Sequence, residues 1–161
     1  MKRSIILTLS IFALLLTWTP LLATDIVAHR GASHDAPENT MSSVLLAWEQ
    51  DADLAEVDVH LTKDNEIVVI HDKDTKRTAG VKLKVKKSTL AELRQLDVGS
   101  WKDAKYAGER ISTLAEVLPT IPAGKRLVVE IKCEGPIIEK LEEVLADSGV
   151  ARAQVVVVSF N

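Results

Sequence analysis

Histidine, arginine and carboxylate side chains recur in the first half of this chain, each near the end of an extended apolar run. His29 and Arg30 follow the first run, Glu56 and Asp58 lie two residues apart in the second, and His71 follows the third. Carboxylates bind divalent cations, arginine binds phosphate, and histidine transfers protons near neutral pH. Together these residue types predict chemistry on a phosphate ester at a site that also holds a metal ion.

Glu56 and Asp58 share one face of the strand expected at 54–61, because side chains alternate along a strand. Two carboxylates on one face repel each other unless a cation or a base lies between them, and Ca²⁺ or Mg²⁺ prefers carboxylate oxygens. A solvated edge strand with alternating charges explains the same pattern. The strand alone leaves both interpretations open, although its apolar neighbours favour a buried strand.

Glu130 and Lys132 repeat this spacing on the strand expected at 127–132. A third carboxylate and an ammonium group can therefore reach the same site, where Lys132 can bind a phosphate oxygen as a point charge. The alternative is a structural ion pair, since a buried charge needs a partner. Cys133 falls on the opposite face and is expected to be a packed residue rather than a nucleophile.

His29 and His71 are expected to act as general acid and base on either side of a phosphorus atom. Either histidine alone would be more typical of a hydrogen-bonded structural residue. Arg30 can hold phosphate through two hydrogen bonds or form a salt bridge with Glu38. Asp72 can orient His71 or be solvated in a loop.

Three further polar groups are not assigned to the chemistry. Residues 37–40 read as the start of a helix, with Asn39 or Thr40 as its cap. His34 lies in a polar loop, and His60 lies further along the face of Glu56, so neither is expected to be catalytic.

Apolar strands that alternate with amphipathic helices must position these residues. Strands are expected at 25–29, 54–61, 66–70, 127–132 and 154–160. This alternation predicts an α/β fold with a parallel sheet, and the candidate residues lie at strand carboxyl ends, where (β/α) barrels build their sites. Because such barrels take about 250 residues, five strands predict the front part of a TIM (β/α) barrel, truncated after Asn161. The lysine- and threonine-rich residues 72–87 are expected to form a solvated excursion.

The first 23 residues read as a secretory signal peptide. Two basic residues precede an apolar run over 5–16, which is shorter than the roughly 20 residues of a membrane helix. We therefore expect a domain over 24–161, incomplete at its C-terminus, that works as a secreted or periplasmic protein with no stable membrane span after cleavage. An uncleaved membrane anchor is the alternative.

Composition narrows the class of protein. With 161 residues, 47% of them hydrophobic, the chain can bury one core. A net charge of −3 without a basic tract gives no reason to expect a nucleic-acid partner, and a small molecule is the expected substrate. The single cysteine excludes an intramolecular disulfide and a multi-cysteine zinc site. The oligomeric state stays open.

An ordered series of short motifs from about residue 26 onward resembles the glycerophosphodiester phosphodiesterases. Any one motif is weak, whereas the ordered set is highly specific. The motifs are Ala28–Gly31, Pro37–Thr40, Glu56–Val59, Leu61–Asp64, Val69–Asp72, Gly99–Trp101, Ile111–Leu118 and Glu130–Lys132.

The resemblance implies a TIM-barrel hydrolase of phospholipid and glycerol metabolism that releases an alcohol and glycerol 3-phosphate from deacylated phospholipids. It also implies that the glycerol 2-hydroxyl attacks phosphorus and that water then opens the resulting cyclic phosphate. The implied roles are acid/base catalysis by His29 and His71, ligation of one Ca²⁺ or Mg²⁺ by Glu56, Asp58 and Glu130, and phosphate binding by Arg30 and Lys132.

Two other functions compete with this one. A phospholipase D-like lipase of similar fold would act on intact lipids, but aromatic residues are only 4% of the chain and the excursion lacks them. A truncated, non-catalytic barrel would expose unpaired strand edges, which promote aggregation.

Overall fold

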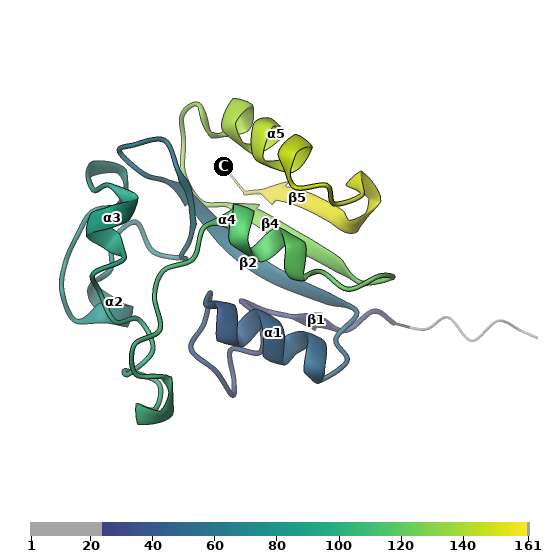
Figure 1. Ribbon diagram of the computed structural model, residues 1–161, viewed down its shortest axis with the longest axis horizontal. Helices are drawn as coiled ribbons and strands as arrows, with labels where there is room; N and C mark the ends of the chain where they lie inside the picture. Colours follow the sequence, from purple (N-terminus) through teal and green to yellow (C-terminus); the bar gives the residue numbers. More distant parts are fainter. Residues whose placement is uncertain (1–23, 161) are drawn as a thin grey trace, which may run out of the picture.

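A five-stranded sheet forms the centre of the computed structural model, which describes residues 24–160 (Figure 1). The strands run in the order β1-β2-β4-β5, and β3 pairs with β2. The predicted signal peptide, 1–23, lies outside the described residues. The strand bounds are Val27–Ala28 (β1), Leu54–Leu61 (β2), Ile67–Val69 (β3), Arg126–Ile131 (β4) and Val155–Ser159 (β5).

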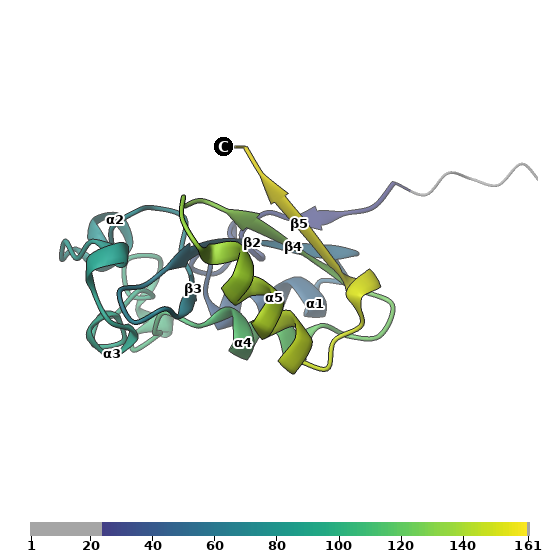
Figure 2. The same ribbon diagram turned by 90° about the horizontal axis from the view of Figure 1, so that it is seen from above.

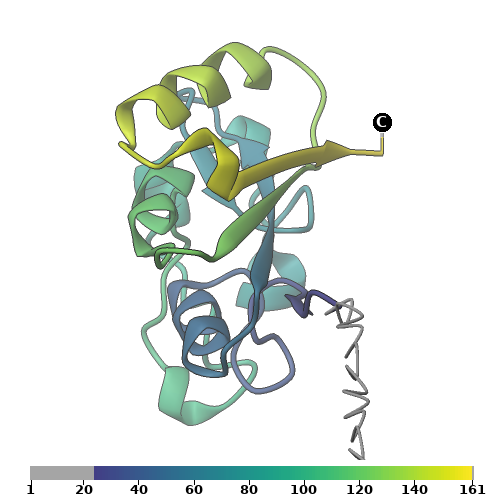
Figure 3. The same ribbon diagram turned by 90° about the vertical axis from the view of Figure 1, so that its right-hand side faces the viewer.

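Three helices cover the same face of this sheet (Figures 2 and 3). They are α1 (Met41–Glu49), α4 (Leu114–Val117) and α5 (Ile137–Asp147). The opposite face carries no helix within residues 24–160, so the apolar packing between helices and sheet lies on one face only. None of the helices formed by these residues has the length and apolar character needed to cross a membrane.

The remaining helices are short. Two of them, α2 (Lys76–Ala79) and α3 (Leu90–Leu93), lie in the segment that follows β3, beyond one end of the sheet (Figure 1). The 3₁₀ turns are Val85–Lys87 (η1), Ala104–Tyr106 (η2), Leu118–Thr120 (η3) and Arg152–Gln154 (η4).

The main core lies between the sheet and its three helices. Val57 and Val59 of β2 and Val129 of β4 are completely buried there, against helix residues such as Val44 and Leu114. Burial of each such side chain stabilises the fold by about 1.5–3 kcal/mol relative to exposure. Local signals place the helices correctly, because threonine caps at Thr40 and Thr113 form the capping boxes that begin α1 and α4.

The third strand differs from the prediction. β3 runs antiparallel to β2, whereas β1, β4 and β5 are parallel to their neighbours, so four strands rather than five form the parallel sheet. The connection at 62–66 is a hairpin turn, and a parallel crossover needs a dozen residues or more. Because the hairpin folds back along β2, the Ile70 N–H donates to the Asp58 carbonyl oxygen at 2.9 Å. His71 therefore lies close to the level of Asp58.

Two other sequence predictions need correction. The excursion at 72–87 is not wholly solvated, because Thr75 and Val85 are buried. Val85 belongs to a second small core that anchors the excursion, formed by Val68, Ile70, Val85, Leu93, Val98 and Ile111. The sequence also predicts a buried first strand, but Val27 is 50% exposed because β1 pairs only with β2 in the described residues.

Candidate active site

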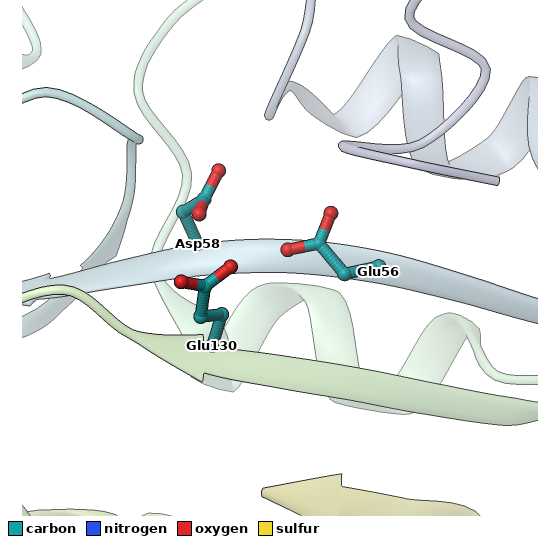
Figure 4. Close-up of side chains that lie close together, drawn as sticks. All are labelled: Glu56, Asp58 and Glu130. Atoms are coloured by element: carbon teal, nitrogen blue, oxygen red, sulfur yellow. The ribbon is translucent and has the colours of Figure 1, made fainter. Parts of the chain in front are cut away.

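Three carboxylates converge on the face of the sheet that carries no helix (Figure 4). Glu56 and Asp58 project from β2 and Glu130 from β4, and one oxygen of each lies within 4.8 Å of the others. The strand register explains this convergence, because Asp58 is the direct partner of Glu130 in the parallel ladder. Sequence spacing predicted that Glu56 and Asp58 share a face and that Glu130 can reach the same place, and the register brings the three together.

Burial destabilises the ionised form of the carboxylates in this cluster. Asp58 is 0% exposed and Glu56 is 7% exposed. Burial raises the pKa of Glu56 to about 7, and the nearby charges of Asp58 and Glu130 act in the same direction. The Arg30 backbone N–H, which donates to Glu56 Oε2 at 2.7 Å, partly opposes that rise.

Two basic side chains balance part of this charge. Arg30 Nε lies 3.3 Å from Asp58 Oδ2, and its Nη1 donates to Glu38 Oε1 at 3.0 Å. Lys132 Nζ donates to Glu130 Oε1 at 2.7 Å and lies 3.8 Å from Asp58 Oδ1. The Glu130 hydrogen bond raises the pKa of the Lys132 ammonium. Both predicted phosphate-binding residues therefore lie at the cluster, and the salt bridge between Arg30 and Glu38 is also present.

Backbone geometry explains why a glycine follows Arg30. Arg30 and Gly31 have φ angles of 56° and 71°, and a Cβ added to Gly31 would lie 2.6 Å from the Ser43 carbonyl carbon. Only glycine fits this left-handed turn against α1. The turn directs the Arg30 side chain and its N–H toward the carboxylates.

Two buried carboxylate oxygens indicate what the cluster can hold. Glu56 Oε1 and Asp58 Oδ1 have no hydrogen-bond partner within the described part of the chain. Unsatisfied buried oxygens are costly, and a hard divalent cation is the ligand that converging carboxylate oxygens prefer. The donor set therefore fits a metal ion of the Ca²⁺ or Mg²⁺ type.

The two predicted acid/base histidines occupy different environments. The His29 side chain is 68% exposed, and its Nε2 lies 4.0 Å from Glu56 Oε2. His71 is more enclosed, and its Nδ1 lies 2.7 Å from Asp72 Oδ1. Asp72 therefore lies where it can orient His71, as one of the two sequence interpretations proposed.

His60 was not expected to be catalytic, and Cys133 was expected to be a packed residue. His60 is buried, its Nε2 donates to the His71 carbonyl oxygen at 3.0 Å, and burial lowers its pKa. Cys133 is half-buried against the main core, and burial raises the pKa of its thiol. His34 pairs with Asp35 in its exposed loop.

Asn39 is a site residue that sequence reasoning treated only as a possible helix cap. Its amide nitrogen donates to Asp58 Oδ2 at 2.8 Å, and its amide oxygen accepts from the Asp58 N–H at 3.0 Å. Thr40 caps α1 instead, and Asn39 itself adopts a left-handed φ of 56°. The Pro37–Thr40 motif contained the signal for this role. A helix needs only one capping residue, so Asn39 or Thr40 had to have another function.

Arg77 is the second residue that sequence reasoning missed. Its guanidinium makes two 2.7 Å hydrogen bonds to the Glu38 carboxylate, and its Nε donates to Asp72 Oδ2 at 2.8 Å. The Arg77 hydrogen bond is the main cause that lowers the pKa of Asp72 to about 2. Glu38 contacts Arg30 and Asp72 contacts His71, so Arg77 joins the supports of two predicted site residues.

The sequence and the fold of this chain match known proteins. Residues 29–158 match the glycerophosphoryl diester phosphodiesterase family. A glycerophosphodiester phosphodiesterase from Caldanaerobacter subterraneus is 40% identical over 146 residues, covering 87% of this chain and 59% of that protein.

Solved structures agree with the sequence match. A phosphodiesterase from Oleispira antarctica, solved with the product sn-glycerol-3-phosphate, has a TM-score of 0.80 and 39% identity over 86% of this chain and 58% of that one. A glycerophosphodiester phosphodiesterase from Agrobacterium tumefaciens has a TM-score of 0.78 and 32% identity over 86% of this chain and 59% of that one.

The chain spans between 39% and 59% of the length of three curated relatives that it matches. The solved relatives are TIM barrels, so the prediction of part of a TIM barrel is confirmed, with the helix-covered sheet as a segment of its wall. By sequence and by fold, this chain belongs to the glycerophosphoryl diester phosphodiesterase family.

Proposed function

We propose that the full-length protein hydrolyses glycerophosphodiesters to an alcohol and glycerol 3-phosphate, with one bound Ca²⁺ or Mg²⁺. The observation that carries this proposal is the carboxylate cluster beside Arg30, Lys132 and His29, in which two buried oxygens accept no hydrogen bond from the described residues. Family membership and the product found in the Oleispira relative support the same substrate class.

Glu56, Asp58 and Glu130 would hold the cation, and Asn39 would keep Asp58 in place through its two hydrogen bonds. When bound, the cation supplies Lewis-acid stabilisation of negative charge that develops on the phosphate. Arg30 and Lys132 would bind phosphate oxygens, since each carries donors beyond those that its carboxylate partners accept.

His29 and His71 would transfer the protons. One histidine would accept the proton of the attacking glycerol 2-hydroxyl, and the other would protonate the leaving alcohol. The contact of His71 with Asp72 fixes its ring and leaves Nε2 as the nitrogen for proton transfer. The high exposure of His29 gives it direct access to a bound substrate.

The test is release of glycerol 3-phosphate from glycerophosphocholine by the full-length protein. We expect activity that EDTA abolishes and that Ca²⁺ or Mg²⁺ restores, with the more effective ion identifying the cofactor. His29→Ala should abolish turnover and leave metal affinity nearly unchanged, whereas Asp58→Asn should weaken metal binding. Metal-independent turnover, or loss of metal binding in His29→Ala, would contradict these roles.

We also propose that residues 1–23 direct the protein to a secreted or periplasmic location. Cell fractionation tests this proposal, and the protein should be found outside the cytoplasm with its first residue near position 24. A cytoplasmic protein that retains Met1 would contradict it.

A further inference from the structure

A cavity of about 870 Å³ opens beside the carboxylate cluster, between the ends of β2 and β4 and the excursion. His60 and Lys132 line it, and Lys132 also contacts Glu130 and Asp58 of the cluster, so the cavity borders the candidate site. Its acidic lining residues are Asp74 and Glu134. Its basic lining residues are Lys63, Lys73, Lys82, Lys84, Lys86 and Lys132.

Most of this positive charge is unpaired. Lys82 lies 3.7 Å from Asp74, and Lys132 pairs with the cluster. The other four lysines of the cavity make no ion pair within the described part of the chain, in a protein whose net charge is −3. With six lysines and two carboxylates the lining has a net positive charge, and a concave surface with such an excess attracts ions of the opposite sign.

The fold holds these lysines in defined places. Asp74 and Lys84 form an isolated antiparallel bridge, and the Val85 N–H donates to the Lys73 carbonyl oxygen at 3.1 Å. Val85 is 1% exposed in the second small core, whereas Lys84 and Lys86 on either side of it are exposed. A buried residue between two exposed lysines therefore anchors the basic wall of the cavity.

We propose that this lysine-lined cavity binds a phosphate group carried by the leaving alcohol of the substrate. The inference rests on the proposed function and specifies its substrate class, which is glycerophosphodiesters whose leaving alcohol bears a second phosphate. Lys132 borders both the candidate site and the cavity, so an alcohol attached to a phosphate at Arg30 and Lys132 can reach the cavity. Ammonium groups bind a phosphate dianion as point charges without requiring one orientation.

A matched pair of substrates tests the proposal. Glycerophosphoglycerol and the same compound with a terminal phosphate on its leaving glycerol differ only in that phosphate. The full-length protein should show a higher kcat/KM for the phosphorylated compound. Lys84→Gln/Lys86→Gln should reduce that preference about tenfold and leave turnover of glycerophosphoglycerol nearly unchanged.

Lys87→Gln/Lys105→Gln is the matched control, because both lysines are exposed and lie outside the cavity lining, and the change in net charge is the same. The control should keep the full preference. Equal preference in the two double variants, or no preference in the unmodified protein, would overturn the proposal.

Calorimetric titration of the phosphorylated compound separates this outcome from a failure of the proposed function. If neither compound is hydrolysed, the proposed function fails. A binding constant that is about tenfold weaker in Lys84→Gln/Lys86→Gln than in the control would then still support the cavity as a phosphate site, and equal constants would overturn it.

Discussion

The two faces of strand β2 are almost equally shielded from water and are chemically opposite. On the helix-covered face, Val57 and Val129 are 0% exposed among other apolar side chains. On the other face, Asp58 is also 0% exposed, and it lies among two more carboxylates. Burial therefore stabilises the fold on one face and raises the energy of ionised groups on the other.

This contrast shows how one segment of chain can serve both stability and chemistry. Side chains alternate along a strand, so a valine that packs against the helices directs the neighbouring acid to the opposite face. The apolar face must also supply enough stability to hold the carboxylates together before any cation arrives. We expect substitutions on the two faces to separate stability from activity.

The largest separation should come from neighbouring residues of β4. Glu130→Gln should lower kcat/KM about a thousandfold, because it removes a charge from the proposed metal site. It should change the free energy of unfolding little, since Glu130 is only partly buried and a glutamine oxygen still accepts from Lys132. Chemical denaturation and the glycerol 3-phosphate assay on the same preparation measure the two effects.

Val129→Ala is the matched change on the other face. It should lower the free energy of unfolding by about 2 kcal/mol and leave kcat/KM of the folded protein nearly unchanged. If Glu130→Gln and Val129→Ala lose the same stability and both keep their activity, stability and activity do not depend on separate faces of the sheet.

The ionisation of Glu56 should make the stability of the metal-free protein depend on pH. Its pKa in the metal-free protein is about 7, above the value of 4.5 expected for an unfolded chain, so the folded state binds more protons between these values. The metal-free protein should therefore lose up to about 3 kcal/mol of stability as pH rises from 4.5 to 7.

Glu56→Gln should remove most of this loss, so the metal-free variant should be more stable than the unmodified protein at pH 8 and close to it at pH 4.5. Urea denaturation at the two pH values in EDTA measures the difference. A variant that is equally destabilised at both pH values would show that Glu56 is not held under electrostatic strain.

Alternation along the strands made one half of this contrast predictable from sequence. Alternation places Val57 and Val59 on one face of β2 and Glu56 and Asp58 on the other, and in the structure the valines pack in the main core while the carboxylates cluster on the opposite face. The direction of β3 was predicted wrongly, because an apolar run carries no signal for parallel or antiparallel pairing. Residues 62–65 do read as a tight turn in the sequence, and so short a connection allows only an antiparallel hairpin.

Contacts across the fold were harder to foresee than positions along a strand. Arg77 lies in a lysine-rich segment that reads as solvated, yet it reaches Glu38 across a separation of 39 positions. The turn at Asn39 could be read as a helix cap because the same residue types serve both roles. Local sequence patterns therefore predicted the members of the carboxylate cluster well and the residues that support it poorly.

Asn39→Ala tests whether a support can be removed without unfolding the apolar face. The variant loses two hydrogen bonds to Asp58, so metal affinity should fall about 10- to 100-fold. Isothermal titration with Ca²⁺ and Mg²⁺ measures this loss. Asn39→Asp retains an acceptor but adds a fourth negative charge, so the metal-free form of this variant should be no more stable than that of Asn39→Ala. Full metal affinity in Asn39→Ala would exclude a supporting role for Asn39.

Arg77→Met should have the smallest effect, because Arg77 acts on the site only through Glu38 and Asp72. We expect kcat to fall about tenfold with little change in metal affinity, since the ligands of the proposed metal site keep their own contacts. Arg77→Lys should recover little activity, because an ammonium cannot bridge two carboxylates as the planar guanidinium does.

The pH dependence of kcat separates this positioning role from a general loss of stability. Without Arg77, the carboxylate of Asp72 is less stabilised, so its pKa should rise from about 2 and the acidic limb of the profile should move to higher pH. A variant whose activity falls in proportion to its folded fraction, with an unshifted profile, would place Arg77 with the packing residues. The residues that support the site would then be confined to the neighbourhood of the carboxylate cluster and would not include the excursion.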